Sequence, residues 1–103
     1  MNKQAATDSP MAAAEAVCVP ARMGEGVDPL ALAGLEMALD NFARVWREDI
    51  VIPKSAASVL AELAPSLESS SYLYQDERRE IIRELAVRLA DRVARCFVVK
   101  SQS

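Results

Sequence analysis

The sequence predicts an all-α protein, a small antiparallel helical bundle of three main helices preceded by a flexible N-terminal arm. Apolar residues recur at intervals of three and four in two long segments, and stretches containing Pro, Gly or Ser separate the segments. A chain of 103 residues, 51% of them apolar, can close one modest core. We therefore expect an arm over residues 1–27 and a single helical domain over residues 28–100.

The arm is predicted from a lack of pattern. Residues 1–27 are rich in alanine, contain Pro10 and Pro20 and show no sustained apolar period. A short helix with Ser9 as its N-cap is the alternative, but about ten residues are marginal for a helix that packs on nothing. In a mobile arm Cys18 would react with an alkylating reagent faster than Cys96, which falls on the apolar side of the last segment.

The first main helix is predicted over about residues 29–48. Asp28 is a favourable N-cap, and Pro29 follows at the first helical position, where its missing N–H costs nothing. Acidic and basic residues gather on the side opposite the apolar positions, as in an amphipathic helix. The apolar positions recur at spacings of 3, 4, 3 and 4: Leu32, Leu35, Leu39, Phe42 and Trp46.

A connector and a short second helix are expected next. The β-branched residues of "DIVIPKS" disfavour a helix, and Pro53 forces an extended conformation on the residue before it. Ser55 can then cap a helix over about residues 56–64, which we expect Pro65 to end, with one further turn around Leu67 as the alternative.

The third helix is predicted over about residues 71–97, with Ser70 or Ser71 as its N-cap. Its acidic residues lie near the start and its basic residues near the end, as the helix dipole favours. Its apolar arc covers about 180° of the circumference, whereas contact with one neighbour needs about 100°. It is also far longer than the second helix, so we expect part of its apolar surface to remain uncovered.

Three coverings of this surface stay open: a second copy of the chain, the N-terminal arm, or a different protein. A homodimer is the most economical, because two-fold dimers are the commonest oligomers. The candidate interface consists of apolar residues from the first and third helices: Leu35, Leu39, Phe42, Trp46, Ile82, Leu85, Leu89, Val93 and Phe97.

The arginines of the third helix have two interpretations. Arg88, Arg92 and Arg95 follow one ridge at spacings of 4 and 3, a candidate polar contact for phosphate or an acidic partner. The alternative is pairing along the same helix, where residues three or four apart are neighbours. The pairs expected on that basis are Glu84 with Arg88, Asp91 with Arg95, Asp76 with Arg79 and Glu80 with Arg83. The net charge of −3 speaks against nucleic acid as the main partner.

Composition excludes several classes of function. The chain contains no histidine, so the usual histidine-dependent catalysis and metal sites are absent. We expect no enzyme activity, no catalytic or metal-binding residues and no cofactor. The N-terminal segment lacks the apolar region of a signal peptide, and no window is long and apolar enough to span a membrane.

The function predicted from the sequence is a non-enzymatic helical protein-interaction or oligomerisation module of the cytoplasm, acting through apolar helix faces on itself or another protein. One alternative is an acidic chaperone or antitoxin-like regulator that masks a partner protein. The other is a weak nucleic-acid binder that uses the arginine ridge.

Overall fold

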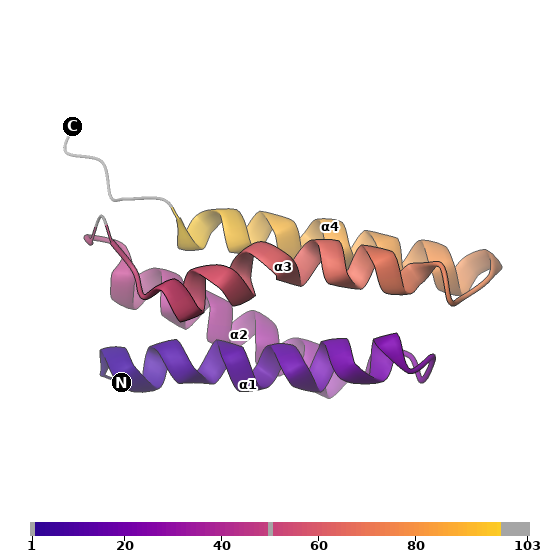
Figure 1. Ribbon diagram of the computed structural model, residues 1–103, viewed down its shortest axis with the longest axis horizontal. Helices are drawn as coiled ribbons and strands as arrows, with labels where there is room; N and C mark the ends of the chain where they lie inside the picture. Colours follow the sequence, from indigo (N-terminus) through magenta and orange to yellow (C-terminus); the bar gives the residue numbers. More distant parts are fainter. Residues whose placement is uncertain (1, 50, 98–103) are drawn as a thin grey trace.

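The computed structural model describes residues 2–49 and 51–97, and within them the regular structure is entirely helical (Figure 1). The four helices are α1 (Lys3–Arg22), α2 (Pro29–Trp46), α3 (Lys54–Ser71) and α4 (Asp76–Cys96). The all-α class is confirmed. The expected count of three main helices is wrong, because the segment assigned to a flexible arm is α1.

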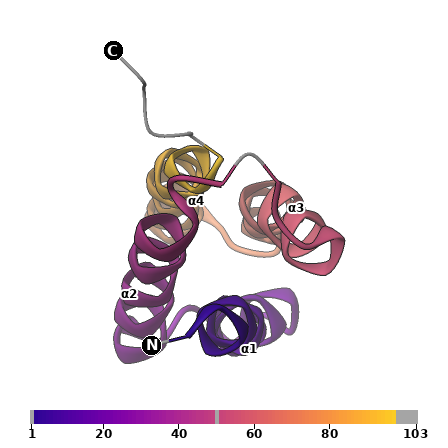
Figure 2. The same cartoon turned by 90° about the vertical axis from the view of Figure 1, so that its left-hand side faces the viewer.

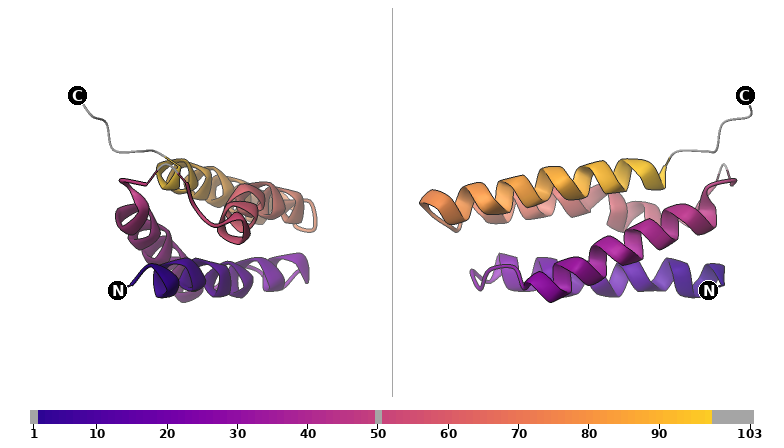
Figure 3. Two further views of the ribbon diagram at one scale, coloured as in Figure 1. Left: turned by 60° about the vertical axis from the view of Figure 1, so that its left-hand side comes forward. Right: turned by 180° about the vertical axis from the view of Figure 1, so that it is seen from behind.

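The helices form two hairpins that lie against each other. Consecutive helices run in opposite directions, so α1 and α2 make one hairpin and α3 and α4 make the other (Figure 1). Between the hairpins, α1 contacts α3 and α2 contacts α4. Viewed along the long axis, the four helices stand at the corners of a quadrilateral around the core (Figure 2). Seen from behind, α2 crosses obliquely from α1 towards α4 (Figure 3).

Helix α1 forms because its small residues pack against two other helices. The Asn2 side chain caps its start by accepting a hydrogen bond from the Ala5 N–H at 2.8 Å. Ala14, Val17 and Ala21 recur at intervals of three and four and are buried. Their small side chains produce only a faint apolar period, which explains the wrong prediction of an arm. Packing on α2 and α3 stabilises a helix that would be marginal alone.

Helix α2 begins as the sequence predicts. The Asp28 carboxylate accepts a hydrogen bond from the Leu30 N–H at 3.2 Å, and Pro29 is the first helical residue. The helix ends at Trp46, two residues before the expected boundary, which is within the ordinary uncertainty of a helix end.

Helix α3 is longer than predicted, because Pro65 lies inside it instead of ending it. A proline in this place removes the hydrogen bond to the carbonyl of the residue four positions earlier, Ala61. Ala61 is exposed, so water can meet that carbonyl. Leu60, Leu63 and Leu67 on the inner side are buried, and their burial outweighs the lost bond.

The predicted N-caps of the last helix belong to α3 instead. Ser70 and Ser71 are buried at the end of α3, where their hydroxyls donate hydrogen bonds to the carbonyls of Ser66 and Glu68. Helix α4 therefore starts at Asp76, several residues later than expected.

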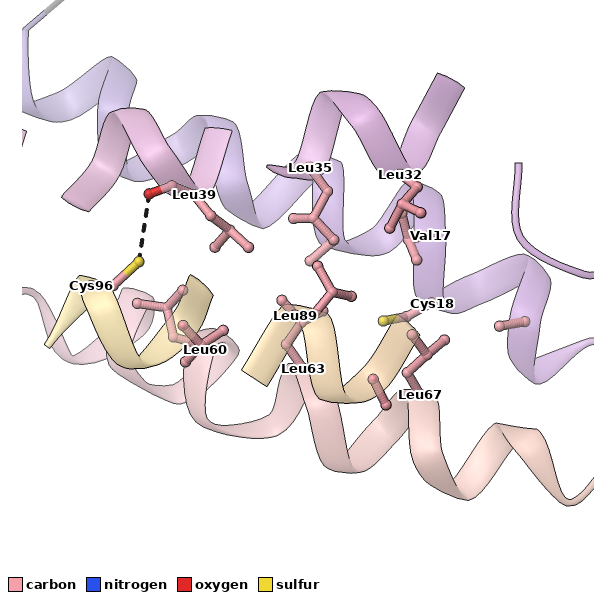
Figure 4. Packing of buried hydrophobic residues seen from close by; sticks show 14 of the residues in the cluster. Val17, Cys18, Leu32, Leu35, Leu39, Leu60, Leu63, Leu67, Leu89 and Cys96 are labelled. Carbon is pink, nitrogen blue, oxygen red and sulfur yellow. Dashed lines mark hydrogen bonds between the residues drawn. The ribbon is translucent and has the colours of Figure 1, made fainter. Parts of the chain in front are cut away.

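The core lies between the two hairpins. Leu35 of α2 and Leu63 of α3 point towards Leu89 of α4 in the middle of the protein (Figure 4). Val17 and Cys18 of α1 line the same core beside Leu67 and Leu32. All four helices thus contribute to one continuous apolar cluster.

A single hydroxyl group joins the turns of the two hairpins. Tyr74 lies between α3 and α4 and is 4% exposed. Its hydroxyl donates a hydrogen bond to the Ala21 carbonyl at 3.0 Å and accepts one from the Gly26 N–H at 2.7 Å. Gly26 has a φ of +87°, a left-handed conformation that favours glycine. The α1–α2 turn is therefore held against the α3–α4 turn.

Replacing Tyr74 with phenylalanine tests this link. The change leaves a backbone N–H and a carbonyl without their partner, and we expect the free energy of unfolding to fall by about 1–3 kcal/mol. Tyr72→Phe is the matched control, because Tyr72 is 63% exposed; it should change stability by less than about 0.5 kcal/mol. Urea denaturation measures both variants, and equal losses would show that the hydroxyl of Tyr74 does not hold the turns.

Candidate functional site

Most of the candidate interface predicted from the sequence lies in the core. Six of its nine residues are buried: Leu35, Leu39, Phe42, Ile82, Leu89 and Val93. Leu85 and Trp46 are partly buried, and only Phe97, at 49%, is substantially exposed. The chain thus covers most of the surface expected to remain open. The cover comes from the N-terminal segment, which the sequence left open as one of three coverings and which forms α1, and from the second half of α3.

Trp46 is enclosed between the end of α2 and the start of α1. Its ring stacks on Phe42 with 6.1 Å between the ring centroids, and the Lys3 ammonium lies over it at 4.6 Å. Lys3 also forms an ion pair with Asp49 at 3.0 Å. These contacts tie the N-terminal end of α1 to the end of α2, so Trp46 is not presented to a partner.

The arginine ridge of α4 is used largely inside the protein. The Arg88 guanidinium donates to both carboxylate oxygens of Glu36 on α2, at 2.8 and 3.1 Å. Arg92 donates to the same carboxylate at 2.9 Å and also pairs with Asp40. Two turns of α4 are therefore held to two turns of α2 by two arginines and two carboxylates, which we call the Glu36 network.

The sequence-based pairing scheme is right for two of its four pairs. Within α4, Asp91 pairs with Arg95 at 2.8 Å and Glu80 with Arg83 at 3.4 Å. Arg88 turns to α2 rather than to Glu84. Arg79 donates to the backbone carbonyls of Tyr74 and Tyr72.

The Glu36 network shifts the titration of its members. The Glu36 side chain is only 13% exposed. The hydrogen bond from Arg88, followed by the charges of Arg88 and Arg92, lowers the pKa of Glu36 below its ordinary value despite partial burial, which acts in the opposite direction. The hydrogen bond to Glu36 raises the pKa of Arg88, and the hydrogen bond to Asp40 raises the pKa of Arg92. With two carboxylates facing two arginines, this part of the ridge offers little net charge to a phosphate.

Both cysteines are buried thiols, which corrects the expectation of an exposed Cys18. Cys18 lies in α1 against α3, and burial raises its pKa. The Cys96 Sγ donates to the Leu39 carbonyl at 3.5 Å (Figure 4), and burial together with the nearby Asp40 raises its pKa to about 11. Thiolate nucleophiles are therefore scarce near neutral pH.

The outer side of the α1–α2 hairpin is a feature that the sequence reasoning missed. A row of exposed apolar or small uncharged residues runs along it at spacings near seven, with the charged Asp40 and Arg44 beside it. We call this surface the hairpin face: Ala5, Ala12, Ala16, Val19 and Met23 of α1, with Leu30, Ala33, Gly34 and Met37 of α2. The heptad spacing from Leu30 to Met37 and from Ala5 to Ala12 and Val19 is the signal that points to it. It was missed because residues 1–27 are predicted to be a flexible arm, which has no helix face.

A hollow lies in the hairpin face where the two helices meet. It is a shallow groove of about 530 Å³, lined by Ser9 of α1 and by Gly34, Met37, Ala38 and Asn41 of α2, with Asp40 and Arg44 at its rim. A Cβ added to Gly34 would meet no atom within 4 Å. A glycine inside a helix costs about 1 kcal/mol relative to alanine, and no neighbour within this chain requires one at position 34.

The outer side of α4 has the opposite character. Its exposed residues are mostly charged and include Glu77, Arg78, Glu80, Arg83, Glu84, Asp91 and Arg95. The outer side of α4 also exposes Ile81 and Val87, but it is richer in charge than the hairpin face.

Comparison with known proteins adds no assignment: no family model, no curated protein and no solved structure matches the chain. In the described part of the chain, no helix combines the length and the apolar character needed to cross a membrane.

The Glu36 network makes a prediction about stability. We expect Glu36→Gln to lower the free energy of unfolding by about 1 kcal/mol, because the hydrogen bonds from two arginines lose their charged acceptor. Asp91→Asn, which disrupts an exposed pair on α4 alone, should cost no more than a few tenths of a kcal/mol. Urea denaturation at neutral pH compares them, and equal losses would show that the interhelical network contributes nothing beyond a surface pair.

The sign of the pH dependence follows from the lowered pKa of Glu36. Its stabilising contribution is complete above its ordinary pKa of 4.5 and disappears as the pH falls through the lowered value of the folded state. The difference in stability between the wild type and Glu36→Gln should therefore shrink below pH 4.5. A difference that grows on acidification would contradict this assignment.

The thiols give a prediction about reactivity. At pH 8 a thiol with a pKa of about 11 is ionised in about one molecule in a thousand. We expect iodoacetamide to label both cysteines at least about tenfold more slowly in the native protein than in denaturant. Peptide mapping by mass spectrometry measures each site, and immediate native labelling of Cys18 would contradict its burial.

Proposed function

We propose that this protein is a non-enzymatic helical protein-interaction or oligomerisation module, and that it acts through the hairpin face. The observation that carries the proposal is the row of exposed apolar or small uncharged residues along the outer side of α1 and α2. Although 26% of the chain is charged, Leu30, Gly34 and Met37 follow one another on the exposed side of α2, and the charged residues beside them, Asp40 and Arg44, stand at the rim of the groove.

The physical argument concerns solvation. Exposed apolar side chains are ordinary when scattered, but a contiguous apolar strip on a small protein is typical of a contact surface. The cores of protein interfaces are depleted in charge and enriched in methionine, as is this strip with Met23 and Met37. The charged side chains on the outer side of α4, in contrast, are well hydrated and gain less from burial in an interface.

This proposal moves the contact surface predicted from the sequence. Residues such as Leu39 and Leu89 would reach a partner only if the fold opened, because they are buried. The hairpin face is available without such a change. Two unpaired thiols support a reducing compartment such as the cytoplasm as part of the proposal.

Site-specific photo-crosslinking in the source cells tests the proposal. A benzophenone amino acid at position 37 should yield crosslinked adducts, whereas the same group at position 87 should yield few. The two sites are matched, since Met37 is 73% and Val87 is 72% exposed, but they lie on different hairpins. Adducts from position 87 alone, or from neither position, would refute the hairpin face as the contact surface.

A further inference from the structure

We infer that the hairpin face takes a second copy of this chain, with α2 antiparallel to α2 of the other copy across a two-fold axis and Met37 of each copy seated over Gly34 of the other. This inference rests on the proposed function and names its partner.

Gly34 supplies the first reason. The residue is exposed in the interior of α2, where glycine weakens a helix, and nothing in its own chain occupies the space of a side chain. Glycine is favoured at such a position when another helix approaches closely. The groove beside it, bounded by Ser9 and Ala38, is open to receive an unbranched side chain.

Met37 is the side chain that fits this hollow in a second copy. It is exposed one turn after Gly34, and methionine is flexible enough to fill an irregular groove. A two-fold axis midway between the two positions brings Met37 of each copy to Gly34 of the other at the same time. Such mutual pairing is the property of an isologous contact.

The charges at the ends of α2 agree with this register. When two antiparallel copies of a helix are related by a two-fold axis, the residue numbers of each pair of opposing residues add up to the same value. With Met37 opposite Gly34, Leu30 lies opposite Asn41, and Arg44 comes within one position of Asp28 on the other copy. Arg44 and Asp28 are both exposed, so each end of the contact joins opposite charges.

The acidic residues of α2 do not oppose the contact. Glu36 and Asp40 are paired with arginines of α4, so that Asp40, which stands at the rim of the groove, meets the other copy with its charge balanced by Arg92. A parallel arrangement, in contrast, would set Arg44 against Arg44. The antiparallel contact is therefore the one that the charges favour.

The size of the hairpin face sets the expected strength. Helices of 18 and 20 residues are about 27–30 Å long and about 10 Å wide, which makes a footprint of roughly 600 Å². A stable standard interface buries about 800 Å² on each partner. We therefore expect a reversible dimer with a micromolar Kd.

Sedimentation of the full-length protein from about 1 to 100 µM, a range that brackets a micromolar Kd, tests the inference. The wild type should pass from monomer to dimer. Gly34→Gln should raise the Kd at least about tenfold without lowering the melting temperature, because a Cβ at position 34 meets no atom of its own chain within 4 Å. Ala61→Gln, which places the same side chain at an exposed position of α3, is the matched control and should still dimerise.

Two further variants keep the inference testable if Gly34→Gln does not fold. Met37→Ser removes the inserted side chain while leaving Gly34 intact, and it should weaken the dimer even if Gly34→Gln misfolds. Asp28→Asn keeps a capping side chain but removes its charge, so it should weaken the dimer and reduce the dependence of the Kd on salt.

The outcomes separate this inference from the proposed function. A wild type that stays monomeric at 100 µM, or a dimer insensitive to both Gly34→Gln and Met37→Ser, overturns the second copy as partner. If position 37 still crosslinks in cells, to a chain of another mass, the proposed function stands without it. A dimer that is weakened by Gly34→Gln and by Met37→Ser, together with crosslinked adducts of twice the chain mass, supports the second copy as partner and the proposed function.

Discussion

The apolar inner sides of α2 and α3 are only partly shielded from water by α4. Helix α1 approaches both helices closely and shields the rest. Helix α1 packs on both of these helices but does not reach α4, so it closes the core from the opposite corner. Its buried residues include Ala6, Ala14 and Ala21, whose small side chains permit this approach. Further alanines, Ala5, Ala12 and Ala16, are exposed and keep part of its outer side small and uncharged. One compositional feature therefore accounts for the closed core and for half of the hairpin face.

The sequence was sufficient for elements whose local signals agree with their packing. The helical class, the Asp28 cap and the buried side of α2 all follow from strong apolar periodicity and good capping. It was insufficient for α1 and for the second half of α3, where packing overrides local signals. Alanine contributes little apolar area to a periodic pattern, and Pro65 argues for a helix end unless Leu67 is known to be buried beyond it.

The prediction that α4 needs two neighbours is confirmed, whereas the apolar surface predicted to remain uncovered is mostly covered. Its wide apolar arc does require two neighbours, and α2 and α3 are those neighbours. Most of the surface predicted to remain uncovered is covered because α3 extends past Pro65, whereas Ile81 and Phe97 stay exposed. The Glu36 network was missed for a different reason: spacing rules pair residues within one helix. A usable signal existed, since Glu36 and Asp40 on α2 match the four-residue spacing of Arg88 and Arg92 on α4.

The Glu36 network and the hairpin face are linked through the geometry of α2. This helix has a buried side, an acidic flank and an outer apolar side, and its acidic residues are held at the flank by the arginines of α4. Were those carboxylates unpaired, the exposed one, Asp40, would be free to turn towards the groove whose rim it occupies. Arg92 thus acts in two ways, since it fastens α4 to α2 and balances the charge of the carboxylate at the rim of the groove. The arginines that suggested a contact with phosphate are used instead to pair the acidic flank of α2 beside the hairpin face.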